Sequence, residues 1–235
     1  MDRREMLGAL GALGFGVTLA GATAKADDHN PAKKDAMGPL DGGHAHFCGI
    51  HLVKSDPQKQ FIVQHFCAAH SSGMFQCLLF DSADKNAKLL GVEYIVSHET
   101  YLGLPKEEKK YWHAHTYEVL AGGLIAPGMK PDDEMKFMKM ILTTWGKSYH
   151  TWPDPKSAVP MGEPLLMWSA IGDGQIQDKV LAERDEQFKV SAAMLRELRG
   201  KEIGYEVPNV SLPDSIKAIG RQWTDADPDK PTLRK

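Results

Sequence analysis

The sequence predicts an α+β fold with a mainly antiparallel sheet and helices packed on it. Segments with two-residue alternation and tight turns come mostly in the first half, and helical periodicity is concentrated in the C-terminal half. The chain has 235 residues, 42% of them hydrophobic and 25% charged, so it can bury a core and is neither disordered nor fibrous. A formal charge of −3 gives no electrostatic basis for binding nucleic acid.

The first 26 residues form a predicted export signal. Arg3 and Arg4 precede an uncharged run rich in Gly and Ala over residues 7–24, and small residues fit cleavage near Ala24 or Ala26. This arrangement resembles a twin-arginine signal, which implies the twin-arginine translocation machinery as a partner and a mature protein in the periplasm or secreted. The alternative is an uncleaved anchor helix, because the run reaches the lower limit for a membrane span.

Three further parts are predicted beyond the signal. Residues 27–43 are polar, contain Pro and Gly and lack periodicity, which indicates a flexible linker. Residues 44–207 form a single predicted domain. Residues 208–235 are rich in Pro and Asp and are expected to be an extended tail.

The first predicted strands form a hairpin. Residues 60–67 and 74–80 alternate as strands on either side of a loop at residues 71–73. This loop pairs His70 with Met74 and therefore places Cys67 opposite Cys77, with His65 on the same face. A third strand is expected over residues 89–96.

The later elements mix strands and helices. A short charged helix follows Pro105, and residues 113–125 show the alternation of a strand that ends as a loop. The clearest helix is expected from about residue 132 to residue 145, stopped by Gly146, with its apolar stripe formed by Met135, Met138, Ile141, Leu142 and Trp145. A strand over residues 165–169 and helices near residues 175–186 and 191–199 complete the prediction.

Histidines gather in three segments of the chain. In an extended conformation His44, His46 and Cys48 project from one face, and His51 follows shortly after. The other candidate ligands are His65 in the hairpin and the group at His113, His115 and Glu118. Two H-x-H pairs with outlying His and Glu are typical of a non-structural site for a transition metal, with Zn, Fe, Mn and Cu all compatible. Glu118 falls on the opposite parity from the two histidines beside it if that segment is a regular strand.

Each candidate has a simpler interpretation. A single H-x-H pair often belongs to the surface or to structural hydrogen bonds. Cys67 and Cys77 are either a disulfide across the hairpin or two small buried side chains, and three cysteines are too few for a disulfide-dense scaffold. The chain lacks the zinc-protease, zinc-finger, phosphate-loop and nucleophile-elbow motifs. No reaction is therefore indicated.

Several segments together resemble one known family. They are HAHFCGIH (44–51), QHFC (64–67), MFQCLLFDS (74–82), NAKLLGVEY (86–94), LPKEEKKYWHAHTYEV (104–119), GKSYHTW (146–152), PMGEPLLMW (160–168) and DGQI (173–176). By these segments the chain is identified as a member of the oil-body-associated protein family, long defined as a domain of unknown function. Residues matching the family pattern are His44, His46, Cys48, His51, His65, Cys67, Cys77, His113, His115, Glu118 and His150.

Two hypotheses from different classes follow. Plant members of the family are associated with seed oil bodies, so the resemblance implies a non-catalytic protein on a lipid or membrane surface, in which the histidines are structural. The histidine pattern and the export signal instead favour an exported metal-binding protein whose histidines converge from three segments at one site. Of the two, the sequence favours the exported metal-binding protein.

Overall fold

A computed structural model describes residues 45–70 and 72–203 of the chain. The predicted signal, the linker, His44 and the predicted tail at 208–235 lie outside these residues. The described elements are β1 (Ala45–Val53), β2 (Asp56–Ala69), β3 (Phe75–Phe80), β4 (Leu89–Val96), α1 (His98–Gly103), α2 (Lys106–Lys109), β5 (His113–Ala114), α3 (Thr116–Leu120), α4 (Pro131–Ile141), β6 (Trp145–His150), β7 (Leu165–Trp168), α5 (Asp178–Phe188) and α6 (Ala192–Ile203). None of the described helices is long and apolar enough to cross a membrane.

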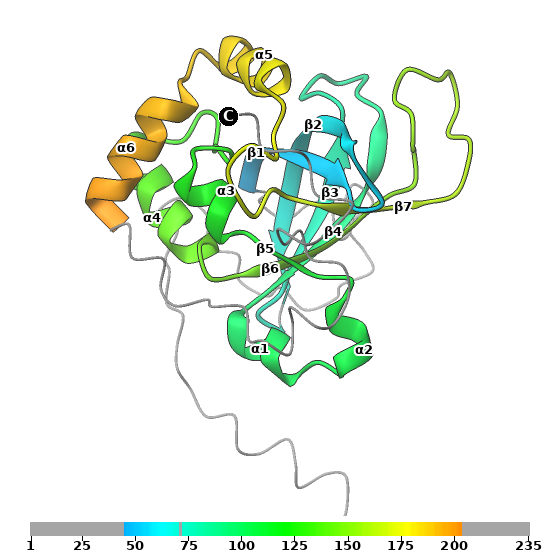
Figure 1. Ribbon diagram of the computed structural model, residues 1–235, viewed down its shortest axis with the longest axis horizontal. Helices are drawn as coiled ribbons and strands as arrows, with labels where there is room; N and C mark the ends of the chain where they lie inside the picture. Colours follow the sequence, from blue (N-terminus) through cyan, green and yellow to red (C-terminus); the bar gives the residue numbers. More distant parts are fainter. Residues whose placement is uncertain (1–44, 71, 204–235) are drawn as a thin grey trace, which may run out of the picture. The chain divides into compact units, whose positions relative to one another are not determined.

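The strands form one antiparallel sheet that closes on itself. Its order is β4-β3-β2-β1-β7-β6-β5, and β4 also pairs with β6, so six strands make a barrel (Figure 1). Closure depends on Gly91, because a β-carbon there would lie 1.9 Å from the carbonyl oxygen of Tyr149 on β6. The helices follow in the second part of the chain, which confirms the predicted α+β class.

The register of the ladders decides which side chains face the barrel interior. Cys67 on β2 pairs with Cys77 on β3, Cys77 pairs with Glu93 on β4, and Glu93 pairs with Ser148 on β6. Paired residues lie on the same face of a sheet, and so do residues two apart on one strand. The interior face therefore also carries His65 on β2. The hairpin register and the strand over residues 89–96 match the sequence prediction.

The apolar core lies inside the barrel and against two helices. Buried side chains of the strands, including Phe47, Val63 and Ile95, cluster with Val119 of α3 and Met138 of α4. Lys130 precedes α4, Pro131 opens it, and three acidic residues in its first turn favour the helix N-terminus.

Two predicted elements are wrong. Residues 113–125 form only a two-residue strand followed by helix α3, because a short segment that alternates can also satisfy the helical period. The helix expected to reach residue 145 ends at Ile141, and Trp145 instead begins β6. Trp145 fits the apolar stripe of the predicted helix because its side chain is buried. It is buried on β6 instead, where its ring stacks on that of Tyr101 at a centroid distance of 3.6 Å.

Candidate metal centre

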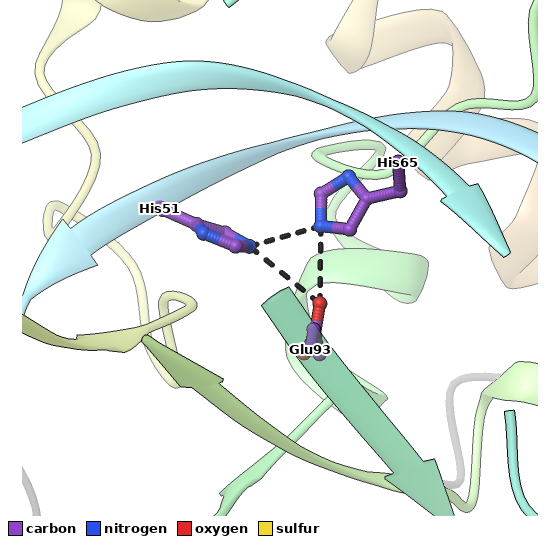
Figure 2. A group of neighbouring side chains, drawn as sticks. All are labelled: His51, His65 and Glu93. Carbon is purple, nitrogen blue, oxygen red and sulfur yellow. Dashed lines mark hydrogen bonds and ion pairs between the residues drawn. The ribbon is translucent and has the colours of Figure 1, made fainter. Parts of the chain in front are cut away.

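A single buried carboxylate gathers four imidazoles inside the barrel. Glu93 projects inward from the middle of β4 and is 1% exposed. Its Oε2 lies 3.1 Å from Nε2 of His65 and 3.8 Å from Nε2 of His51 (Figure 2). Its Oε1 lies 3.3 Å from Nε2 of His113 and 3.4 Å from Nε2 of His115. All four histidines are buried, so strands far apart in sequence deliver nitrogen donors to one carboxylate.

The histidines reach the site through the sheet register and one helix start. His51 lies on the same face of β1 as Phe47, which pairs with His65 on β2. His113 pairs with Gly146 on β6, and His115 comes two residues later, just before α3 begins. Gly146 makes room for the cluster, because a β-carbon there would lie 2.1 Å from Oε1 of Glu93.

Glu118 joins the site because its segment is helical. One turn of α3 separates it from His115, and its Oε1 lies 3.9 Å from Nε2 of that histidine. A strand would have turned the two side chains to opposite faces, which is why the alternation in the sequence argued against it. Burial and the nearby charge of Glu93 hold the pKa of Glu118 well above its usual value.

In two of the histidines, the ring nitrogen that faces away from Glu93 makes its own hydrogen bond. Nδ1 of His65 donates to the carbonyl oxygen of Val63 at 3.1 Å. Nδ1 of His115 lies 2.7 Å from Oγ1 of Thr144, and that hydroxyl donates to the carbonyl oxygen of Ile141. The hydroxyl therefore accepts from His115. Such contacts from the far ring nitrogen are what orients metal-binding histidines in proteins.

Charge inside the barrel is concentrated on Glu93. Burial would raise its pKa, but hydrogen bonds with His113, His115 and His65 outweigh burial and hold the pKa well below its usual value. Burial lowers the pKa of His51 and, with a smaller opposing effect of Glu93, that of His115. These two imidazoles are therefore neutral at physiological pH and keep a lone pair for a ligand.

His150 extends the cluster on one side. Its Nε2 lies 3.1 Å from Nδ1 of His51, and burial with the nearby His65 lowers its pKa to about 3. It matches the family pattern but was not among the metal ligands expected from the histidine spacing. Position 150 lies two residues along β6 from Ser148, on the interior face.

The structure separates His46 and Cys48 from the cluster. Both lie on the opposite face of β1 from His51, because they differ from it by an odd number of residues. Nε2 of His46 lies 2.9 Å from Oε1 of Gln64, and its ring stacks on Phe66. His44, the other histidine expected on that face, lies outside the described residues. Cys48 is a buried free thiol.

Cys67 and Cys77 are joined in a disulfide across β2 and β3. The bond lies on the interior face, where Cys77 pairs with Glu93. The sequence left open whether these side chains were oxidised or simply buried. Their sulfurs are therefore engaged with each other, and the donors that meet at Glu93 are nitrogen and oxygen.

Glu93 is the candidate site residue that the sequence analysis missed. It is the only charged residue of its strand, and that strand contains no histidine. The signal was available in the hairpin register, since continuing the pairing from Cys77 across the next turn brings Glu93 to the face of His65. A charged residue at an inward position of a strand needs a partner, which marks it as a candidate ligand.

Together, the fold and the site define an antiparallel β-barrel protein with a buried imidazole–carboxylate cluster that could hold a metal ion. In two groups of three residues the possible ligand atoms all lie within 4.8 Å of one another. These groups are His51 with His65 and Glu93, and Glu93 with His113 and His115.

The family model described as "Protein of unknown function (DUF1264)" matches residues 37–203. Oil body-associated protein 1B of Arabidopsis thaliana is 36% identical over 173 residues, which cover 73% of this chain and 72% of the relative. Oil body-associated protein 1A of Zea mays is 35% identical over 205 residues, which cover 79% of this chain and 86% of the relative. The chain belongs to the oil body-associated protein family. No solved structure matches it.

Proposed function

We propose that this protein binds a transition metal inside its barrel, through His51, His65, Glu93, His113 and His115. The donor set of imidazoles with a carboxylate suits Zn, Fe, Mn or Cu. Thiolate, which would select softer ions, is absent among the donors gathered at Glu93.

The observation that carries this proposal is the approach of four buried imidazoles to one buried carboxylate. Nδ1 of His65 donates to the carbonyl oxygen of Val63, which can only accept. The other ring nitrogen, Nε2, faces Oε2 of Glu93 at 3.1 Å. A buried carboxylate needs a positively charged partner, and a metal ion bound by these atoms would supply it.

His115 has the same arrangement. The hydroxyl of Thr144 donates to the carbonyl oxygen of Ile141, so Nδ1 of His115 donates to the hydroxyl. The other ring nitrogen, Nε2, faces Oε1 of Glu93 at 3.4 Å. Metal ions bind imidazole and carboxylate in their deprotonated forms, so metal binding at these atoms would release any proton held there.

Elemental analysis by mass spectrometry tests the proposal. The full chain is exported natively and purified untagged without chelators, beside Glu93→Gln and His65→Ala. His46→Ala is the matched control, because it removes an imidazole from the other face of the sheet. We expect at least one equivalent of a transition metal in the wild type and in the control, and a loss of metal in the two site variants. Metal far below one equivalent in the wild type, unchanged by the substitutions, would overturn the proposal.

We also propose that the protein works outside the cytoplasm after export by the twin-arginine machinery. The paired Arg3 and Arg4 before an uncharged run support this, and disulfides such as Cys67–Cys77 are typical of oxidising compartments. The mass of the exported protein is the test. A chain that begins at Lys25 or Asp27 is expected, and an intact N-terminus would contradict cleavage.

A lipid surface is the second candidate for what the protein binds. The relatives are named oil body-associated proteins, and Val159 and Met161, on the segment between β6 and β7, are 56% and 65% exposed. Flotation with phospholipid vesicles tests it, and Val159→Ser/Met161→Ser is expected to reduce the bound fraction. Wild-type protein that stays at the bottom of the gradient would rule this candidate out.

A further inference from the structure

The carboxylate of Glu93 divides the four imidazoles into two pairs. Its Oε2 faces His51 and His65, and its Oε1 faces His113 and His115. The two groups of donors that satisfy metal geometry share only Glu93. Each oxygen of one carboxylate therefore belongs to a different candidate site.

The first group has the dimensions of a metal site. The Nε2 atoms of His51 and His65 are 3.0 Å apart, and Oε2 of Glu93 lies 3.8 and 3.1 Å from them (Figure 2). Donors bound to one ion at about 2.0–2.2 Å lie roughly 3–3.5 Å apart at tetrahedral or octahedral angles. One ion can therefore contact all three atoms with little movement.

The second group surrounds a space that Gly146 leaves open. A β-carbon on this glycine would lie 2.1 Å from Oε1 of Glu93, 2.7 Å from Nε2 of His115 and 2.9 Å from Nε2 of His113. Three donor atoms therefore line the side of Gly146 that faces the cluster, and a side chain at this position would collide with them. Glu118, beside His115, brings a second carboxylate to this side of the site.

The two contacts lie on different sides of the carboxylate. Nε2 of His65 faces Oε2, and Nε2 of His115 faces Oε1. An ion between His65 and Oε2 does not lie between His115 and the other oxygen. Metal binding at both contacts therefore takes one ion on each side of the carboxylate.

We propose that the barrel holds two metal ions bridged by Glu93, one bound by His51 and His65 and the other by His113 and His115. This inference rests on the proposed metal-binding function and adds the number of ions and the bridge. In two-metal sites of proteins the ions lie about 3.5–4 Å apart, a spacing that one bridging carboxylate spans. Glu93 offsets part of the charge of the two divalent ions.

Metal stoichiometry tests the inference. The full chain is stripped with a chelator, reloaded with Mn²⁺ or Zn²⁺, freed of excess ion by gel filtration and analysed for metal and protein. We expect two equivalents in the wild type and in the His46→Ala control, one in His51→Ala, one in His113→Ala, and almost none in Glu93→Gln. Far-ultraviolet circular dichroism checks that each variant is folded.

A second measurement needs no variant. Electron paramagnetic resonance of the wild type loaded with Mn²⁺ is expected to show the exchange-coupled spectrum of a close pair of ions. One equivalent in the wild type with an uncoupled spectrum, lost in both His51→Ala and His113→Ala, would overturn the two-ion inference and leave the proposed metal site standing. A wild type that binds none of the added ions would overturn both.

Discussion

At the scale of single residues, the proposed metal site depends on groups that hydrogen-bond to the imidazoles from behind. Thr144 accepts from Nδ1 of His115 while donating to Ile141, and this fixes which nitrogen faces Glu93. We expect Thr144→Val, which keeps the shape but removes the hydroxyl, to weaken metal binding by about 10–100-fold, as losses of such supporting groups do. Competition with a chromogenic chelator measures the dissociation constant. Thr143→Val is the control at the adjacent position, and equal affinities in the two variants would contradict the role of Thr144.

Cys48 gives a prediction for pH. Burial raises the pKa of its thiol to about 12, with Arg184 and a hydrogen bond from Gln64 opposing burial. Above pH 9 the unfolded chain releases this proton and the folded protein keeps it, so the free energy of unfolding falls by up to about 1.4 kcal/mol per pH unit. Below pH 8 the group contributes no pH dependence.

Urea unfolding from pH 7 to pH 11 checks the sign. Because other groups also titrate there, the relevant quantity is the difference in free energy of unfolding between wild type and Cys48→Ala. We expect this difference to be constant up to about pH 8 and then to shift against the wild type. A difference that stays constant to pH 11 would contradict the buried, neutral thiol.

At the scale of elements, the sequence pattern predicted the hairpin and β4 correctly. It was less successful for segments whose pattern fits both a strand and a helix. The hairpin and β4 follow from alternation and a short loop, and their register was predictable because a turn fixes it. The closure of β4 on β6 and the helical start of α3 were not predictable. Both depend on contacts between distant segments, such as Gly91 against Tyr149 and Thr116 donating to Leu142.

The same distinction applies to the candidate site. His51, His65, His113 and His115 were predictable as residue types that bind metal, and the structure brings them together. His46 was misassigned because parity along one strand does not say which face is interior. The approach of Glu93 to His65 follows from the pairing of β3 with β4, but its contacts with His113 and His115 form only when β4 closes on β6.

Two buried arginines connect the C-terminal helices to the site. Arg199 of α6 donates to the carbonyl oxygens of Val119 and Leu124, and Arg184 of α5 donates to those of Gly122 and Gly123. These carbonyls border α3, which carries Glu118. The helices thereby hold the segment that completes the cluster.

We expect Arg199→Met to lower the free energy of unfolding by about 1–3 kcal/mol for each buried carbonyl left without a donor. Arg196→Met is the matched control on α6, since its ion pair with Asp173 is on the surface and should cost less than about 1 kcal/mol. Urea unfolding of both variants decides the matter. Equal losses would mean that the buried carbonyls are not held by Arg199.

At the scale of the whole molecule, a disulfide cross-links two strands of the barrel close to its buried carboxylate, Glu93. The disulfide joins β2 and β3 on the interior face, next to the pairing of Cys77 with Glu93. It closes a short loop, with a sequence separation of 10. The proposed export into an oxidising compartment would therefore favour the bond that stabilises the barrel.

The double variant Cys67→Ala/Cys77→Ala is expected to lose about 2–4 kcal/mol of the free energy of unfolding, because the unfolded chain gains freedom when the cross-link is absent. Urea unfolding measures this, and Cys48→Ala, which removes a thiol outside the bond, is the control. A thiol reductant should lower the stability of the wild type toward that of the double variant and leave the variant unchanged. Thiol titration after denaturation completes the test: the exported chain should show one free thiol, and a chain kept in the cytoplasm by deleting residues 2–26 should show three. Three thiols in the exported protein would contradict both the cross-link and the oxidising destination.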